Sequence, residues 1–109
     1  MFIDLDRLKE VNDRHGHSVV DSLLVSIARH LKSVCRSGDL IARPGGDEFV
    51  VVFPSLENPD VIAGLADKVH DTLNQPDHID DRTLPPPSIG ISIYPDYGDD
   101  LDGLIHIAD

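Results

Sequence analysis

The sequence contains little of what marks several broad classes of protein. Cys35 is the only cysteine, so no disulfide framework can form within the chain. No apolar run approaches the roughly 20 residues that a bilayer-spanning helix needs. Asp4 and Asp6 interrupt the N-terminus where a signal peptide would be apolar. We therefore expect a soluble, cytoplasmic segment that makes no membrane contact.

Positive charge is also scarce. Nine Lys and Arg residues face twenty Asp and Glu residues, which gives a formal net charge of −11. Such a surface repels nucleic-acid backbones and anionic membranes, so a nucleic-acid polymer is not expected as a partner. A single nucleotide could still bind if a cation or backbone dipoles neutralised its phosphates. The composition therefore favours metal-assisted binding of any phosphate ligand.

Aromatic residues make up only 5% of the chain, whereas hydrophobic residues of all kinds make up 40%. A length of 109 residues predicts one domain, and this hydrophobic content is sufficient for one aliphatic core. We find no internal repeat, low-complexity tract or linker, so residues 1–109 are expected to form a single unit.

The spacing of apolar residues predicts several helices. They are expected over residues 6–14, 20–35 and 59–73, with a fourth beginning at residue 101. The second has the clearest pattern, because its apolar side chains recur every three or four positions. Asp6 can cap the first helix, Gly16 can end it, and Pro59 suits the first turn of the third.

Strands are expected over residues 1–3, 40–43, 49–53 and 88–94, with a weak edge strand over 78–83. The run 49–53 is apolar throughout, which predicts burial on both faces, whereas 88–94 alternates and predicts one buried face. Residues 44–47 are typical of a hairpin turn, and a hairpin excludes a wholly parallel sheet. The order of elements therefore predicts an α+β domain, with helices packed on a mostly antiparallel central sheet.

The segment Asp4-Leu5-Asp6 follows the first expected strand directly. An Asp at the end of a buried strand is well placed to hold Mg²⁺, which needs hard oxygen ligands and keeps positions for water and phosphate. The alternative is that these residues only cap the following helix.

The turn at Gly45-Gly46-Asp47-Glu48 is the second candidate site. Two glycines allow positive φ and leave the backbone open to a ligand. Carboxylates repel phosphate, so the acidic pair fits a phosphate site only if a divalent cation lies between them. The alternative is that the acidic residues only keep a turn in solvent. If the first strand and the hairpin are neighbours, Asp4 and Asp47 can share a pair of cations, an arrangement typical of phosphoryl or nucleotidyl transfer.

Several separate segments together resemble one family, the GGDEF (diguanylate cyclase) domains. They are residues 2–17, 21–24, 43–49 and 88–95, which read FIDLDRLKEVNDRHGH, DSLL, RPGGDEF and SIGISIYP. The family's fold is similar to that of class III nucleotidyl cyclase catalytic domains. The resemblance implies condensation of two GTP into cyclic di-GMP and pyrophosphate by a homodimer that needs Mg²⁺ or Mn²⁺.

The resemblance also implies roles for individual residues. The metal ligands would be Asp4, the carbonyl of Leu5, and Asp47. Asp47 or Glu48 would help to deprotonate the 3′-hydroxyl, and Lys9 would stabilise charge on the phosphates. Without the family's motifs, Lys9 reads as part of a solvated helix face.

Two further groups follow from the same resemblance. Asn12 and Asp21 would read the guanine edge with His17 nearby, while Gly45 and Gly46 would let the triphosphate approach. Arg36 and Asp39 would form an inhibitory site for the product cyclic di-GMP. Outside the family context, Asn12 reads as a helix-end cap and Asp21 as a solvated position. Arg36 then reads as a residue favoured at a helix C-terminus, and Asp39 as a turn residue.

The chain also departs from the family pattern. Val20 stands where the family usually has Gly, Leu8 replaces a Phe, and Pro44 replaces a Tyr. The family's leading helix and its C-terminal segment with Lys and Arg are not found in residues 1–109, so we expect a GGDEF fragment. The alternative function is a regulatory module that binds GTP or cyclic di-GMP without synthesis and controls a neighbouring domain, such as an EAL phosphodiesterase, in the parent chain.

Overall fold

The computed structural model describes residues 1–5, 8–56, 58, 60–73 and 87–108. Its elements are β1 (Phe2–Leu5), α1 (Leu8–His15), α2 (His17–Val34), β2 (Leu40–Ala42), β3 (Glu48–Val52), α3 (Val61–Leu73), β4 (Pro87–Gly90) and α4 (Leu101–Ala108). The four strands form one sheet in the order β2-β3-β1-β4, and every neighbouring pair is antiparallel. The predicted α+β architecture is therefore confirmed. No helix among the described residues has the length and apolar character required to cross a bilayer.

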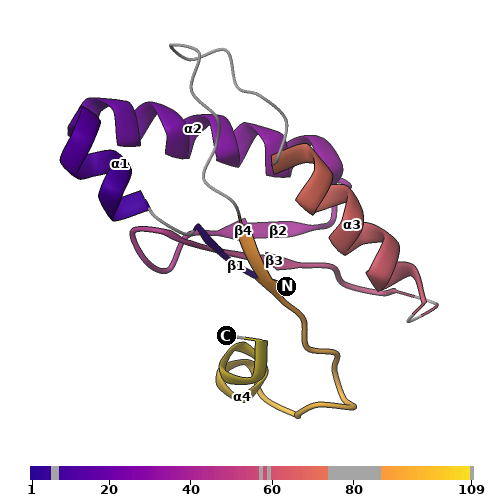
Figure 1. The fold of residues 1–109 in the computed structure, drawn as a ribbon. Coiled ribbons are helices and arrows are strands. Elements are labelled where there is room, and N and C mark those ends of the chain that lie inside the picture. The colour runs from indigo at the N-terminus through magenta and orange to yellow at the C-terminus, as the bar shows by residue number, and fades with distance from the viewer. Residues whose placement is uncertain (6–7, 57, 59, 74–86, 109) are drawn as a thin grey trace.

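The helices lie in two layers. Figure 1 shows α2 and α3 over one face of the sheet, α1 beside the start of α2, and α4 on the opposite side. The first layer is closely packed, because its sheet and helix side chains are almost wholly buried. These core side chains are Ile3, Leu5, Leu23, Ile27, Leu31, Phe49, Val51, Val69 and Leu73.

Side chains along the strands alternate between the two faces, as the strand period requires. Ile3 and Leu5 of β1 and Phe49 and Val51 of β3 belong to the core beneath α2 and α3. The expectation that 49–53 is buried on both faces is only partly correct, because Val52 is 39% exposed. The layer formed by α4 covers the second face incompletely.

The last strand is shorter than the sequence predicts. β4 ends at Gly90, whereas residues up to 94 were expected to continue it. The C-terminal end of α4 crosses there, and a side chain on Gly90 would collide with the backbone of Ala108. Ser92 Oγ then donates a hydrogen bond to the Leu104 carbonyl at 2.7 Å, so the chain turns toward α4 instead of continuing in the sheet. The expected edge strand over 78–83, the proposed cap Asp6 and the helix start at Pro59 lie outside the described residues.

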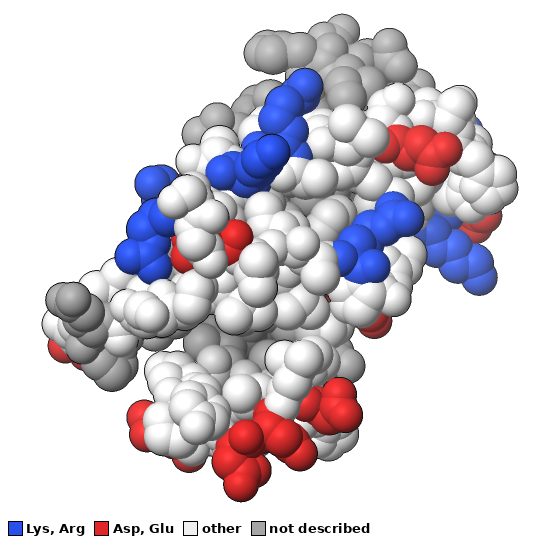
Figure 2. Space-filling view, turned by 180° about the vertical axis from the view of Figure 1, so that it is seen from behind, with Lys and Arg blue, Asp and Glu red and all other residues white. Residues whose placement is uncertain are grey.

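Charge is distributed unevenly over the molecule. Residues 87–108 contain four Asp and no Lys or Arg, and Asp96, Asp99, Asp100 and Asp102 are all exposed. Figure 2 shows red side chains grouped over α4 and its preceding loop, with the blue side chains elsewhere on the same view. The α4 side is therefore unfavourable for an anionic ligand.

Replacing Ile27 by Ala tests the core beneath α2. Ile27 has 0% exposure, so its truncation should lower the free energy of unfolding by about 3 kcal/mol through lost burial and a residual cavity. The matched control is Val25→Ala on the same helix, where 67% exposure predicts a change within about 0.5 kcal/mol. Urea titration followed by circular dichroism measures both, and equal losses would contradict the assigned core.

Candidate active site at the β1–β3 edge

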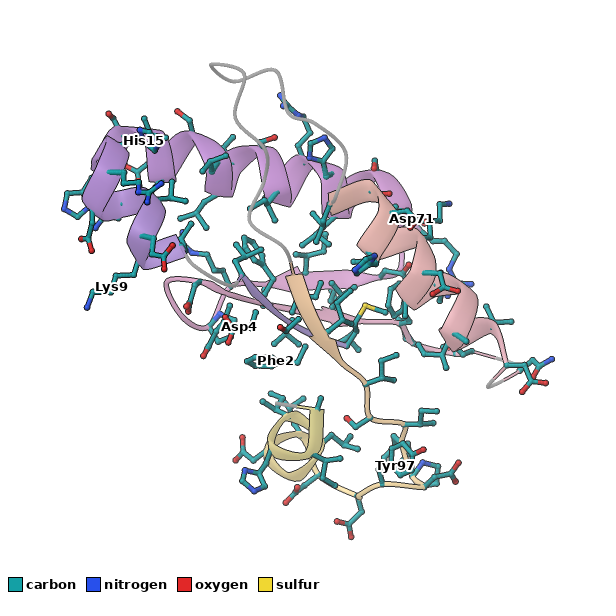
Figure 3. The ribbon with its side chains drawn as sticks, viewed as in Figure 1. Phe2, Asp4, Lys9, His15, Asp71 and Tyr97 are labelled. Atoms are coloured by element: carbon teal, nitrogen blue, oxygen red, sulfur yellow. The ribbon has the colours of Figure 1, made fainter. Side chains whose placement is uncertain are left out.

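The end of β1 and the turn before β3 lie side by side. Asp4 is the register partner of Glu48, and the Leu5 amide donates a hydrogen bond to the Asp47 carbonyl at 2.9 Å. The pairing therefore brings both predicted acidic segments to one edge of the sheet. Figure 3 shows Asp4 beside this turn.

The register also determines which carboxylates face each other. Directly opposite residues in an antiparallel pair project to the same face, with Cβ atoms about 5 Å apart. Asp4 and Glu48 therefore share the face that Phe2 also occupies, opposite the core of α2 and α3. Asp4 was expected to pair with Asp47, whereas the residue directly across the ladder is Glu48. Asp47 lies one position earlier, in the turn, and is half-buried.

The oxygen groups at this edge fit a divalent cation. Like charges directly opposite each other on a sheet are destabilising, and a cation between them reverses that effect. Asp4 and Asp47 supply carboxylates on adjacent segments, and the Leu5 carbonyl lies at the same strand end. Mg²⁺ commonly uses one or two carboxylates and keeps several waters. Within the described residues, no three His, Cys, Asp or Glu side chains form a complete metal-binding group, so backbone oxygen, water or phosphate would have to complete the coordination.

The backbone of the glycine turn differs from expectation. Gly16, with φ of 85°, has positive φ, but neither Gly45 nor Gly46 does. The prediction that this glycine pair supplies positive φ is therefore wrong. A side chain on Gly46 would meet open space, whereas one on Gly45 would meet Glu48.

The residues predicted to read guanine lie on α1 and α2. Figure 1 shows α1 at the same end of the sheet as the β2–β3 turn. Asn12 is half-buried on α1, and its Oδ1 is buried without a hydrogen-bond partner among the described residues. Such a buried acceptor is costly to leave unpaired.

His17 and Asp21 are one helical turn apart at the start of α2, and both are exposed. Positions four residues apart lie on the same helix face, so the two side chains can reach one ligand. Lys9 is also exposed, and Figure 3 shows it extending from α1 into solvent. The structure thus brings the two carboxylate segments into register. Lys9 on α1 and His17 and Asp21 on α2 are all exposed to solvent.

Arg36 and Asp39 form a compact turn between α2 and β2. Their side chains lie 3.4 Å apart, the Arg36 amide donates to Asp39 Oδ2 at 2.7 Å, and the Asp39 amide donates to the Arg36 carbonyl at 3.0 Å. The Asp39 side chain is 2% exposed and the Arg36 side chain 63%. Asp39 therefore fixes the turn, while the guanidinium group stays accessible to an anion. This pair lies at the other end of β2 from the glycine turn.

Cys35 precedes this turn and packs against the core. Burial, followed by the negative charge of Asp39, raises the pKa of the Cys35 thiol above its ordinary value. The thiol is therefore protonated at neutral pH and is a poor nucleophile.

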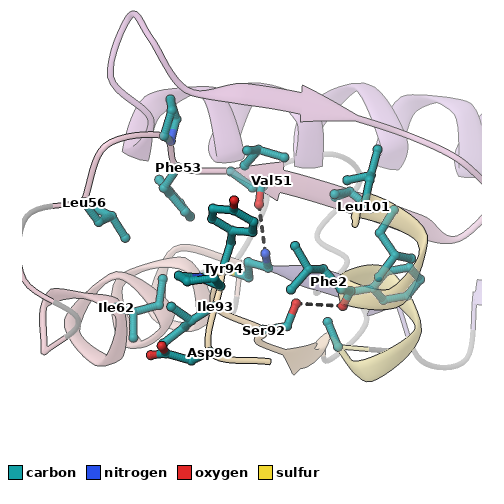
Figure 4. A pocket seen from close by; sticks show the side chains of 18 of the residues that line it. Phe2, Val51, Phe53, Leu56, Ile62, Ser92, Ile93, Tyr94, Asp96 and Leu101 are labelled. Carbon is teal, nitrogen blue, oxygen red and sulfur yellow. Dashed lines mark hydrogen bonds between the residues drawn. The ribbon is translucent and has the colours of Figure 1, made fainter. Parts of the chain in front are cut away.

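An apolar cavity of about 620 Å³, which the sequence did not predict, lies between α4 and the sheet face opposite α2 and α3. Figure 4 shows Phe2, Val51 and Leu101 around it, with Tyr94 at its side. The signal available in the sequence was the wholly apolar run 49–53, whose second face needed a covering layer. The acidic residues around α4 make this cavity a poor place for a nucleotide, so the β1–β3 edge is the stronger candidate.

The raised pKa of Cys35 can be tested with iodoacetamide, because the chain has no other cysteine. The alkylation rate follows the thiolate fraction, so its midpoint should lie at higher pH in the folded chain than in urea. Asp39→Asn should move the folded midpoint downward, because it removes a charge that disfavours the thiolate. Identical midpoints for folded and unfolded chains would refute the assigned environment.

The known proteins of similar sequence belong to one family. The sequence profile described as "Diguanylate cyclase, GGDEF domain" matches residues 1–109. The diguanylate cyclase TpbB of Pseudomonas aeruginosa is 40% identical over 111 residues, which cover 100% of this chain and 26% of TpbB. MucR of the same organism, a bifunctional diguanylate cyclase/cyclic di-GMP phosphodiesterase, is 40% identical over 100% of this chain and 16% of its own length.

A solved structure shares the fold. The structure of the TpbB GGDEF domain from Pseudomonas aeruginosa aligns with a TM-score of 0.90 and 40% identity, over 99% of this chain and 64% of that one. The present chain therefore spans a part of each of these proteins. The register at the β1–β3 edge, the profile match and the shared fold lead to one assignment: the chain belongs to the GGDEF family of diguanylate cyclases.

Proposed function

We propose that this chain is part of the catalytic module of a diguanylate cyclase, which condenses two GTP into cyclic di-GMP and pyrophosphate. The observation that carries the proposal is the pairing of Asp4 with Glu48, beside the turn that holds Asp47. This pairing gathers carboxylates from two separate motifs at one sheet edge. A purely structural turn would not need such a concentration of negative charge.

Asp4, Asp47 and the Leu5 carbonyl would hold Mg²⁺ or Mn²⁺ at that edge. When bound, the ion supplies the positive charge that lets a triphosphate approach acidic side chains. Lys9 adds an exposed cation from α1, and Gly46 leaves one side of the turn unobstructed.

Guanine selection would come from the α1–α2 corner. Asn12, whose Oδ1 lacks a hydrogen-bond partner among the described residues, would contact the edge of the base. Asp21 can accept from guanine N1 and N2, which adenine cannot offer in the same pattern. His17 lies one turn before Asp21 and can contact the same ligand.

In the proposed reaction, Asp47 or Glu48 accepts the proton of a GTP 3′-hydroxyl as the oxygen attacks the α-phosphate of a second GTP. The new bond joins the 3′-oxygen to phosphorus, the bond to the leaving pyrophosphate breaks, and a second such step closes the ring. One chain offers one guanine site, so two chains must face each other as a homodimer. Arg36 and Asp39 would bind the product and inhibit the enzyme, because an exposed guanidinium group held at its base suits a phosphate.

A regulatory module is the second candidate. Val20 stands next to Asp21 and packs against the core, which changes the residue beside the proposed guanine contact. The similarity to the bifunctional protein MucR also fits a parent chain with an EAL domain. In that case GTP or cyclic di-GMP would bind without turnover and control the neighbour.

The Asp47→Ala variant distinguishes these functions. Loss of this carboxylate should lower the rate of cyclic di-GMP formation from GTP and Mg²⁺ by about 100-fold or more, because it removes both a metal ligand and a candidate base. Chromatography of the product, with this chain and with the longer parent protein, measures the rate. Asp67→Ala on the exposed face of α3 is the matched control and should leave the rate unchanged. GTP binding without product in the unmodified parent protein would favour the regulatory module.

The product site is tested by Arg36→Ala. Removal of one charged hydrogen-bonding group should raise the cyclic di-GMP concentration for half inhibition by about tenfold. Arg29→Ala, also an exposed Arg on the preceding helix, should leave that concentration unchanged. Inhibition of the Arg36 variant at the original concentration would remove Arg36 from the proposed site.

A further inference from the structure

The two glycines of the turn have different surroundings. An ideal Cβ placed on Gly45 would lie 2.6 Å from Glu48 Oε2 and 3.0 Å from Glu48 Cδ. The first distance is shorter than real Cβ contacts allow and the second is at their lower limit, so the Glu48 side chain occupies the space a residue-45 side chain would need. A Cβ on Gly46 would have no atom within 4 Å.

Backbone conformation does not explain the glycine at position 45. Its φ lies outside the left-handed region, as does that of Gly46. A left-handed backbone is therefore not the reason for a glycine at either position. What Gly45 provides is empty volume, and the atoms that use this volume belong to the carboxyl end of Glu48.

That carboxyl group matters because of its place in the sheet. Glu48 begins β3 directly opposite Asp4, and it is half-buried. A Glu side chain has several rotatable bonds, so its carboxylate could occupy many positions from the same Cα. The space over Gly45 allows a position folded back across the turn that carries Asp47.

We infer that Gly45 is a positioning residue, which holds open the space where the Glu48 carboxylate lies across the turn beside Asp4 and Asp47. The two glycines then have different roles. Gly45 leaves space for the Glu48 carboxylate, and Gly46 leaves the turn unobstructed for a ligand. The catalytic consequence rests on the proposed function, whereas the geometric statement does not. Alanine at 45 would meet only the far end of a flexible side chain, so the domain should fold with Glu48 turned away.

The geometric statement is tested by NMR without any ligand. The side-chain carboxyl carbon of Glu48 should change its chemical shift in Gly45→Ala and keep it in Gly46→Ala. The two variants differ by one position in the same turn, so general loosening of the turn would move the resonance in both. An unchanged Glu48 resonance in Gly45→Ala, or equal changes in both variants, would overturn the inference.

The consequence for the site is tested by Mn²⁺ titration in the absence of nucleotide. Gly45→Ala should weaken Mn²⁺ binding by about threefold to tenfold, because a carboxylate moves a few ångströms away from the cation. In a Glu48→Ala background the same substitution should change the dissociation constant by less than about twofold, since the side chain it displaces is gone. Equal weakening in both backgrounds would show that Gly45 acts independently of Glu48. Absence of Mn²⁺ binding by the unmodified chain would count against the proposed function, and the NMR comparison would still decide the geometric statement.

Discussion

The antiparallel pairing of β1 with β3 is the interaction on which the rest of the site depends. Its register places Ile3 opposite Phe49 on the core face and Asp4 opposite Glu48 on the other face. A shift of one residue would send Asp4 into the hydrophobic core and bring Ile3 and Leu5 out of it. Because burial of the aliphatic side chains strongly opposes such a shift, the packing of the core also fixes the position of the carboxylates.

One face of β1 therefore packs in the core, and the opposite face carries the acidic side chain of the candidate site. Leu5 is 1% exposed and belongs to the packed layer, yet its amide contacts the turn that carries Asp47. The acidic residues of this site are positioned by the backbone pairing of β1 with β3. The free energy that maintains this pairing comes from burial of the core beneath α2 and α3.

Much of this arrangement could be predicted from the sequence, because it follows from local patterns. The apolar spacing of α2 and the glycine turn between two apolar runs each specify their element within a short window. The resemblance to GGDEF domains added residues such as Asn12, whose buried oxygen the spacing alone would not reveal. The family itself was identified correctly from residues distributed over the whole chain.

The features that could not be predicted depend on contacts between distant segments. Pairing of Asp4 with Glu48 instead of Asp47 depends on register, which the composition of two separate segments does not determine. The end of β4 at Gly90 is set by the approach of Ala108 from α4. The reason for glycine at 45 is the rotamer of a side chain three residues away, whereas the sequence pattern suggested a backbone cause.

The order of strands in the sheet has a consequence for synthesis of the protein. β1 is made before the other described strands, yet it lies inside the sheet, and its partners end at Val52 and Gly90. Phe2 pairs with Val50 on one side and with Gly90 on the other, and both partners are synthesised later than Phe2. On a translating ribosome, Asp4 therefore cannot meet Asp47 and Glu48 until the β2–β3 hairpin has emerged. After that, β1 still has one unpaired edge until β4 is synthesised. During that interval the nascent chain exposes an apolar strand, which is the period when it most needs protection from aggregation.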